Sequence, residues 1–126
     1  MKKTFILFFL VNLSLIFNCK KAPDDIVVIK NQIIRFQLAL IHKNSSQLDS
    51  LFVTKKELLQ KDPSELVNRI FSQDTKNLIM ADKRFEIHDS QAKAIFTVTA
   101  DTFQQKMTLY LIKYKNSWRI VNYEWQ

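Results

Sequence analysis

The sequence predicts an α+β domain in which helices come first and an antiparallel sheet follows. Apolar residues recur at helical spacing from residue 26 to about residue 43, whereas the last third of the chain alternates apolar and polar residues in four separate runs. Short polar stretches separate these runs, as expected for a meander of strands joined by hairpins. A long helix and short middle helices are therefore expected to pack on a curved antiparallel sheet of about four strands.

The first helix is expected to begin at Asp24 and Asp25, because acidic side chains suit an N-cap and a first helical turn. Asn44-Ser45-Ser46 ends it. Two adjacent apolar stripes follow its length and form a broad arc, which is typical of a well-buried helix. The first stripe contains Ile26, Ile29, Ile33, Phe36 and Leu40, and the second contains Val27, Ile34, Leu38 and Ile41.

The middle of the chain carries three signals for helix starts. Ser46 can cap a short turn, and Thr54-x-x-Glu57 has the pattern of a capping box. Asp62-Pro63-Ser64-Glu65 is stronger, because it combines an acidic cap, proline at the first helical position and glutamate at the third. Residues 72–83 have no clear period and are not assigned.

The strands are expected at residues 84–88, 92–101, 106–115 and 118–125. In the last strand, alternation predicts Trp118, Ile120 and Asn122 on one side and Arg119, Val121, Tyr123 and Trp125 on the other. The chain contains no glycine, so its tight turns should fall to Asn and Asp, which tolerate left-handed backbone best after glycine.

Composition excludes several kinds of chemistry. A P-loop, a dinucleotide fingerprint and a nucleophile elbow all need glycine, and this chain of 126 residues has none. One Cys and two His cannot build a Cys-rich zinc site or a disulfide framework. We therefore expect no cofactor and no metal. The basic residues are scattered without an arginine cluster, so nucleic acid is not an expected partner.

The first 18 residues have the features of an export signal. Lys2 and Lys3 precede an apolar run from Thr4 to Phe17, which is shorter than the ~20 residues that a membrane-spanning helix needs. The only cysteine, Cys19, follows this run directly and is itself followed by Lys20 and Lys21.

This segment resembles a bacterial lipoprotein signal with a relaxed lipobox, in which Ile16 and Cys19 match and Phe17 and Asn18 depart from the usual small residues. The resemblance implies a signal peptide over 1–18, acyl chains on Cys19, a tether over 19–23 and a single domain over 24–126. Two or three acyl chains would hold the chain on the extracytoplasmic side of a membrane. Lys20 favours export to the outer membrane over retention at the inner one.

The long helix, the small middle helices and the closing hairpin MTLYLIKYKNSWRIVNYEW resemble the nuclear transport factor 2-like superfamily, which has a cystatin-like cone. The resemblance covers about residues 25–125. It implies the fold and leaves the activity open, because members include enzymes, binding modules and uncharacterised lipoproteins.

Three functions remain open at this point. The favoured one is a non-catalytic binding or structural role at the cell envelope, with a protein partner, a small hydrophobic ligand or a second copy as the occupant. Its binding face would contain Tyr110, Ile112, Val121 and Tyr123 if the middle helices leave that side of the sheet uncovered.

The second is a small cone-fold enzyme acting on a hydrophobic molecule. His88 or Asp82 would act as the base, and Tyr110 and Tyr114 could line the mouth of the cone with them. The third is a protein-interaction or inhibitor module. No group of residues has the spacing that would name a reaction, so no catalytic residue is assigned.

Overall fold

A computed structural model describes residues 21–126 of the chain. The chain divides into two compact units, residues 1–30 and 31–126, and the described part of the first unit is the beginning of the first helix. The expected signal peptide and Cys19 lie outside the described residues. Among the residues that are described, no helix is both long enough and apolar enough to cross a bilayer.

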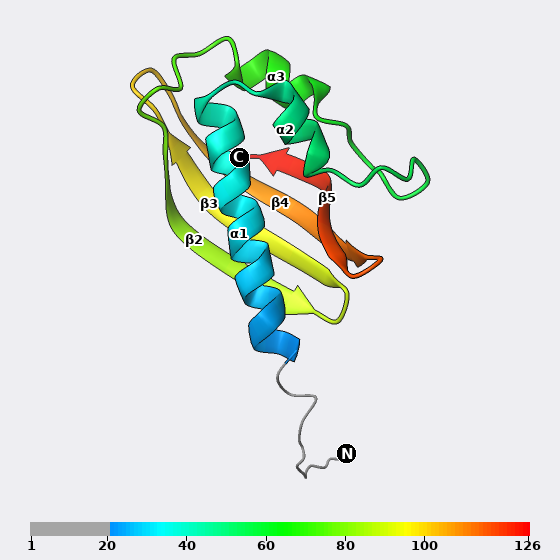
Figure 1. Cartoon of the computed structure of the whole chain (residues 1–126). Helices are drawn as coiled ribbons and strands as arrows, with labels where there is room; N and C mark the ends of the chain where they lie inside the picture. The colour runs from blue at the N-terminus through cyan, green and yellow to red at the C-terminus, as the bar shows by residue number, and fades with distance from the viewer. Residues whose placement is uncertain (1–20) are drawn as a thin grey trace. The chain divides into compact units, whose positions relative to one another are not determined.

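Three helices precede four strands, which confirms the α+β class (Figure 1). The elements are α1 (Lys21–Ile41), α2 (Ser45–Ser50), α3 (Ser64–Ile70), β2 (Ile79–His88), β3 (Gln91–Thr99), β4 (Gln104–Tyr114) and β5 (Ser117–Trp125). Helix α1 therefore starts at Lys21 and includes residues 21–23, which the sequence assigns to the tether. Strand β2 begins at Ile79, inside the stretch that had no clear period.

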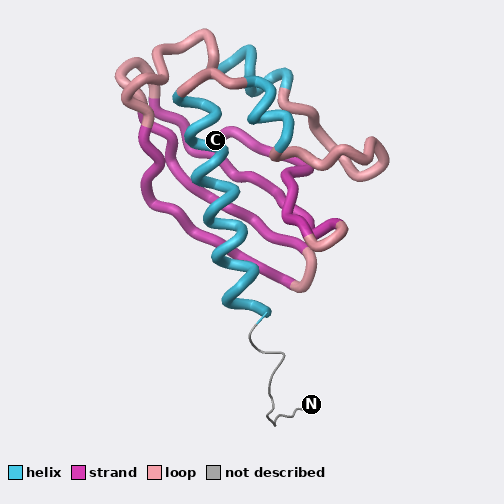
Figure 2. Tube along the Cα trace, viewed as in Figure 1, coloured by secondary structure: helices cyan, strands magenta, loops and turns pink. Residues whose placement is uncertain are grey.

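The strands form one antiparallel meander in the order β2-β3-β4-β5. From Asn31 onward, α1 lies across one face of this sheet, while α2 and α3 lie near one end of it (Figure 2). The Phe36 ring packs edge-on against Phe96 of β3, with ring centroids 6.1 Å apart. The buried Gln32 side chain donates a hydrogen bond from Nε2 to the Trp118 carbonyl oxygen at 2.7 Å, which ties α1 to β5.

The face of the sheet that meets α1, which we call the inner face, is densely filled. Ala94, Phe96 and Val98 of β3 are buried there, as alternation predicts. Strands β4 and β5 add further fully buried side chains, among them Met107, Leu109, Leu111, Trp118, Ile120 and Tyr123.

Only one of the two apolar stripes of α1 is buried. Ile33, Phe36 and Leu40 are inaccessible to solvent, whereas Ile34 is 48% exposed and Leu38 is 41% exposed. The expectation of a helix buried over a broad arc is therefore wrong for the second stripe. The physical reason is that the sheet covers one side of the helix, and no other described element covers the side that carries Ile34 and Leu38.

The middle helices follow only one of the three start signals. A short helix forms near Ser46, but Ser46 lies inside it and Asn44 is its N-cap, with Asn44 Oδ1 accepting from the Gln47 N–H at 3.0 Å. α3 forms after Asp62, whose Oδ1 accepts hydrogen bonds from the Ser64 N–H at 2.9 Å and from the Ser64 hydroxyl. These bonds lower the pKa of the Asp62 carboxyl. The helix expected from Thr54-x-x-Glu57 is absent and a turn stands in its place. The residues on either side of this turn bond to β5 instead: the Val53 N–H donates to the Ile120 carbonyl oxygen and the Gln60 N–H to the Val121 carbonyl oxygen, both at 2.9 Å.

Turns without glycine use the residue types expected, together with lysine. Asp89 has a φ of 53° in the β2–β3 turn, and Lys115 and Asn116 have φ values of 53° and 62° in the β4–β5 turn. Two positive φ values in a row match the type I′ geometry that suits a two-residue hairpin.

Two irregularities alter strand alternation. In β5, Tyr110 pairs with Asn122 but Leu111 pairs with Ile120, so Val121 is an extra residue. Such a bulge reverses which side successive side chains occupy. In β2, the register shifts between Ala81 and Arg84, and Asp82 adopts a φ of 55° there.

Candidate functional site

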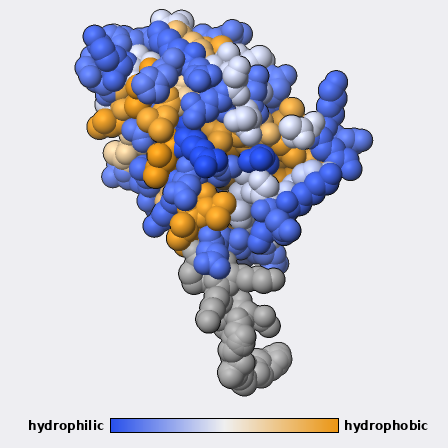
Figure 3. Space-filling view, viewed as in Figure 1, coloured by the Kyte–Doolittle hydropathy of each residue, from blue (hydrophilic) through white to orange (hydrophobic). Residues whose placement is uncertain are grey.

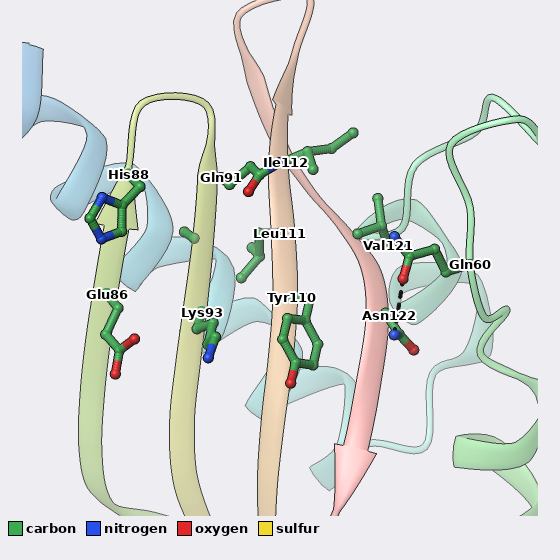
Figure 4. A pocket seen from close by; sticks show the side chains of 11 residues that line it. Gln60, Glu86, His88, Gln91, Lys93, Tyr110, Leu111, Ile112, Val121 and Asn122 are labelled. Atoms are coloured by element: carbon green, nitrogen blue, oxygen red, sulfur yellow. Dashed lines mark hydrogen bonds between the residues drawn. The ribbon is translucent and has the colours of Figure 1, made fainter.

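The face of the sheet opposite α1, which we call the outer face, carries a hollow of about 330 Å³ (Figure 4). Cross-strand register places Glu86, Lys93, Tyr110 and Asn122 in one row across all four strands. These residues alternate with Ala92, Ala94, Leu109 and Leu111, which are buried on the inner face. The next row adds His88, Gln91 and Ile112.

One wall of the hollow comes from the segment between α2 and α3. The Gln60 N–H donates to the Val121 carbonyl oxygen at 2.9 Å, and the Lys61 N–H donates to the same oxygen at 3.1 Å. Asn122 Nδ2 then donates to Gln60 Oε1 at 3.1 Å, as the dashed line in Figure 4 shows. The bulge at Val121 thus turns a backbone carbonyl toward this segment and holds it beside the sheet.

Tyr110 is the aromatic centre of the hollow and is half-buried. Its hydroxyl donates a hydrogen bond to Glu124 Oε1 at 2.7 Å. This bond, with smaller contributions from burial and from the negative charge of Glu124, raises the pKa of the Tyr110 phenol. The ammonium of Lys93 lies 5.8 Å from the centroid of the Tyr110 ring, within the range of a cation–π contact.

The lining therefore combines an aromatic ring, an aliphatic residue, amides and charges of both signs. Such a set can bind a ligand that has an apolar part and hydrogen-bonding groups. Among residues 21–126, no three His, Cys, Asp or Glu side chains are grouped so that they could hold a metal ion.

The structure brings together three of the four residues expected on the binding face. Tyr110, Ile112 and Val121 line the hollow, although Val121 is 97% buried, with only 3% of its surface exposed. Tyr123 does not belong to this face, so this part of the expectation is wrong. It is fully buried on the inner face, where its ring packs edge-on against Phe52 with centroids 6.0 Å apart.

The bulge explains the misplaced residue. Trp118 and Ile120 lie on the inner face as alternation predicts, but the extra residue at Val121 moves Asn122 to the outer face and Tyr123 to the inner face. The only sequence signal for this change is the polar Asn122, which unbroken alternation would have placed in the core.

Only two of the four residues considered for cone-fold catalysis share a site. His88 and Tyr110 line the outer hollow, and His88 is exposed at the end of β2. Asp82 is exposed at the β2 bulge, and neither Asp82 nor Tyr114 lines the hollow. The inner face, where the resemblance to cone-fold enzymes would place a base, is filled by buried side chains such as Phe36, Phe96 and Trp118.

Sequence reasoning missed Gln60, Glu86, Gln91, Lys93 and Asn122 as lining residues. Strand alternation could have placed Glu86, Gln91 and Lys93 on the outer face, because they flank the expected turn at 89–90. Gln60 gives no such signal, since its position depends on hydrogen bonds to a strand some 60 residues later.

No protein-family model matches the sequence, and no curated protein sequence is significantly similar to it. Solved structures are similar in fold. An NTF2-like protein of unknown function from Methylobacillus flagellatus KT superposes with a TM-score of 0.67 at 18% identity, over 81% of this chain and 90% of that one. An NTF2-like protein of unknown function from Shewanella baltica OS155 gives a TM-score of 0.64 at 15% identity, over 82% and 95% of the two chains.

A protein of unknown function with a cystatin-like fold from Nostoc punctiforme PCC 73102 gives a TM-score of 0.59 at 13% identity, over 80% of this chain and 89% of that one. These likenesses cover most of each chain and agree with the order of helices and strands described above. The chain therefore adopts an NTF2-like, cystatin-like α+β fold.

Proposed function

We propose that this protein is a lipid-anchored, extracytoplasmic binding protein of the bacterial cell envelope, whose outer-face hollow holds its ligand without catalysis. The observation that carries the binding role is the hollow itself, where a half-buried Tyr110 and Ile112 lie among amide and charged groups from all four strands. The anchor rests on the apolar leader, the position of Cys19 and the lipobox that Ile16 and Cys19 resemble.

Packing on the inner face supports binding over catalysis. A cone-fold enzyme needs a cavity that admits substrate next to a base. Here the inner face is occupied by Phe36, Phe96, Trp118 and Tyr123, each at most 2% exposed. The two candidate bases, Asp82 and His88, are both exposed and neither is buried on that face.

The mixed lining indicates the class of ligand. Tyr110 and Ile112 offer apolar surface, and Gln60 and Asn122 offer amide groups that are already held by their mutual hydrogen bond. Glu86 and Lys93 stand side by side in the register and carry opposite charges. A partner segment with one apolar side chain and flanking polar groups fits this lining better than a purely apolar molecule does.

The anchor is tested by metabolic labelling with a palmitate analogue in a bacterial host. We expect the full chain to incorporate the label and the Cys19→Ala variant to lose it. Intact mass spectrometry should show residues 1–18 removed and acyl chains on the cysteine. Separation of inner from outer membranes then tests whether Lys20 accompanies outer-membrane localisation. A full chain that retains its leader and a free thiol would refute the anchor.

The binding role is tested in intact cells with a photo-crosslinking amino acid in place of Ile112. The matched control places the same group at Lys106, which is exposed on β4 outside the hollow. We expect a discrete adduct from position 112 that Tyr110→Asp abolishes without unfolding the domain. An adduct of twice the chain mass would identify a second copy as the partner. Equal, diffuse crosslinking from both positions would contradict binding in the hollow.

A further inference from the structure

Helix α1 exposes large apolar side chains on the side that faces away from the sheet. Ile34 is 48% exposed and Leu38 is 41% exposed, and they lie four residues apart, so they share one helix face. Figure 3, viewed from the α1 side, shows apolar surface among hydrophilic side chains.

The residues around this stripe are basic. From Ile26 to Leu48 the sequence contains no Asp or Glu, while it contains Lys30, Arg35, His42 and Lys43. Arg35 and Lys43 are exposed. A helix with exposed apolar residues flanked by lysine and arginine is typical of segments that lie in the interface of an anionic membrane.

Because Cys19 is the proposed site of acylation, a membrane is the partner that we expect at this exposed helix face. α1 begins at Lys21, two residues after Cys19 along the chain. Acyl chains on Cys19 would therefore keep the protein next to a lipid surface, so that lipid is available to the exposed side of residues 31–41.

We infer that residues 31–41 of α1 lie along an anionic lipid surface, with Ile34 and Leu38 in the headgroup region and Arg35 against the lipid phosphates. This inference rests on the proposed lipid anchor and adds an orientation to it. Because residues 31–41 cover the inner face of the sheet, this orientation leaves the hollow on the outer face directed away from the membrane. The ligand would then reach the hollow without competing with lipid.

The test uses the full chain, produced and processed in a bacterial host and reconstituted into vesicles. Cys19 is the only native cysteine, so a fluorophore can be attached to an added cysteine in Leu38→Cys once Cys19 is acylated. The matched control is Lys106→Cys, whose position is exposed on β4 next to Met107, a residue buried on the inner face. Lipids brominated near the headgroup quench a fluorophore that lies in the interface.

In vesicles that contain phosphatidylglycerol, we expect quenching at position 38 to exceed that at position 106 several-fold. Arg35→Glu combined with Leu38→Cys should reduce quenching at position 38, because it places a negative charge on the lipid-facing side, whereas Lys106→Glu combined with Leu38→Cys should leave it unchanged. Ile34→Ser combined with Leu38→Cys should also reduce this quenching, because a half-exposed aliphatic side chain is lost from the lipid-facing side.

Equal quenching at positions 38 and 106, on protein whose Cys19 carries acyl chains, would overturn the orientation and leave the anchor intact. Energy transfer between labelled copies at position 38, in place of quenching by lipid, would assign the face to a second copy and equally overturn the inference. Mass spectrometry on the same sample that shows bare Cys19 would refute the anchor and, with it, the premise of the orientation.

Discussion

The hydroxyl group of Tyr123 joins β5 to the start of α3 through two hydrogen bonds. The Leu66 N–H donates a hydrogen bond to Tyr123 Oη at 3.3 Å, and the Tyr123 hydroxyl group donates one to the Asp62 carbonyl oxygen at 2.7 Å. Leu66 is the third residue of α3, so its N–H has no partner within the helix. Both Tyr123 and Leu66 are fully buried. The Tyr123 hydroxyl on β5 therefore supplies the acceptor for the Leu66 N–H in the first turn of α3, and it also binds the backbone of Asp62 just before this helix.

Tyr123→Phe keeps the ring and its edge-on packing against Phe52, and removes only these two hydrogen bonds. A buried donor left without an acceptor costs about 1–3 kcal/mol, so we expect the free energy of unfolding to fall by that amount. In a domain of this size, each kcal/mol lowers Tm by roughly 4 °C, which gives a decrease of about 4 to 12 °C. Urea and thermal denaturation, followed by circular dichroism at pH 7, measure both quantities.

The same variant has a distinct pH signature. Burial raises the pKa of the Tyr123 phenol, and nearby Glu65 and Asp62 add to this, so the folded state binds the phenolic proton more tightly than the unfolded state does. The stabilisation is fully present below the unfolded pKa of about 10 and is lost as pH rises above it. The difference in stability between wild type and Tyr123→Phe should therefore narrow above about pH 10.

Tyr110→Phe is the matched control, because its hydroxyl bonds the exposed Glu124 on the outer face. A surface change of this kind should alter stability by no more than about 0.5 kcal/mol. If Tyr123→Phe costs no more than Tyr110→Phe, the role assigned to the Tyr123 hydroxyl is refuted.

Three further outcomes are expected. Glu124→Gln should lower the pKa of Tyr110 toward its usual value, because the charged acceptor of the phenolic hydrogen bond is lost; a titration by NMR of the ring resonances that shows no change would contradict this. Gln32→Met should lower the free energy of unfolding by about 0.5–1.5 kcal/mol in urea denaturation, since it removes the buried hydrogen bond from Gln32 Nε2 to the Trp118 carbonyl oxygen. Deletion of Val121 should lower the free energy of unfolding by about 1–3 kcal/mol while unfolding stays cooperative, because Ile120 and Asn122 keep their partners across the strand but the carbonyl that accepts the Gln60 and Lys61 N–H groups is lost; a variant as stable as wild type would show that these two bonds do not hold the segment beside β5.

The local pattern of apolar and polar residues was enough to predict which segments form strands and which form the first helix. The alternation in β3 and β4 and the helical spacing in α1 depend only on which side chains are apolar, and both patterns were confirmed because one side of each element is buried. The cap at Asp62 and the turns at Asp89 and Asn116 were likewise predictable, because their hydrogen bonds or backbone angles are set by neighbouring residues.

The candidate site depended on features that no local pattern encodes. Tyr110 and Ile112 were placed correctly by alternation, but the bulge at Val121 moved Tyr123 into the core and Asn122 into the hollow. Gln60 reached the site through backbone bonds to Val121, and the segment expected to form a helix after Thr54 became an irregular stretch along β5. In each case, contacts between residues far apart in the sequence outweighed the local preference.

The amino-acid sequence alone determined the order of elements, the apolar leader with its single cysteine and the exclusion of glycine-dependent chemistry, since these depend on residue type and spacing. Only the tertiary structure decided which apolar stripe of α1 is covered, which face of the sheet is hollow and on which side Tyr123 lies. The physical reason is that the spacing of apolar residues shows which side of a helix or strand can be buried. Which other element covers that side depends on how the whole domain packs.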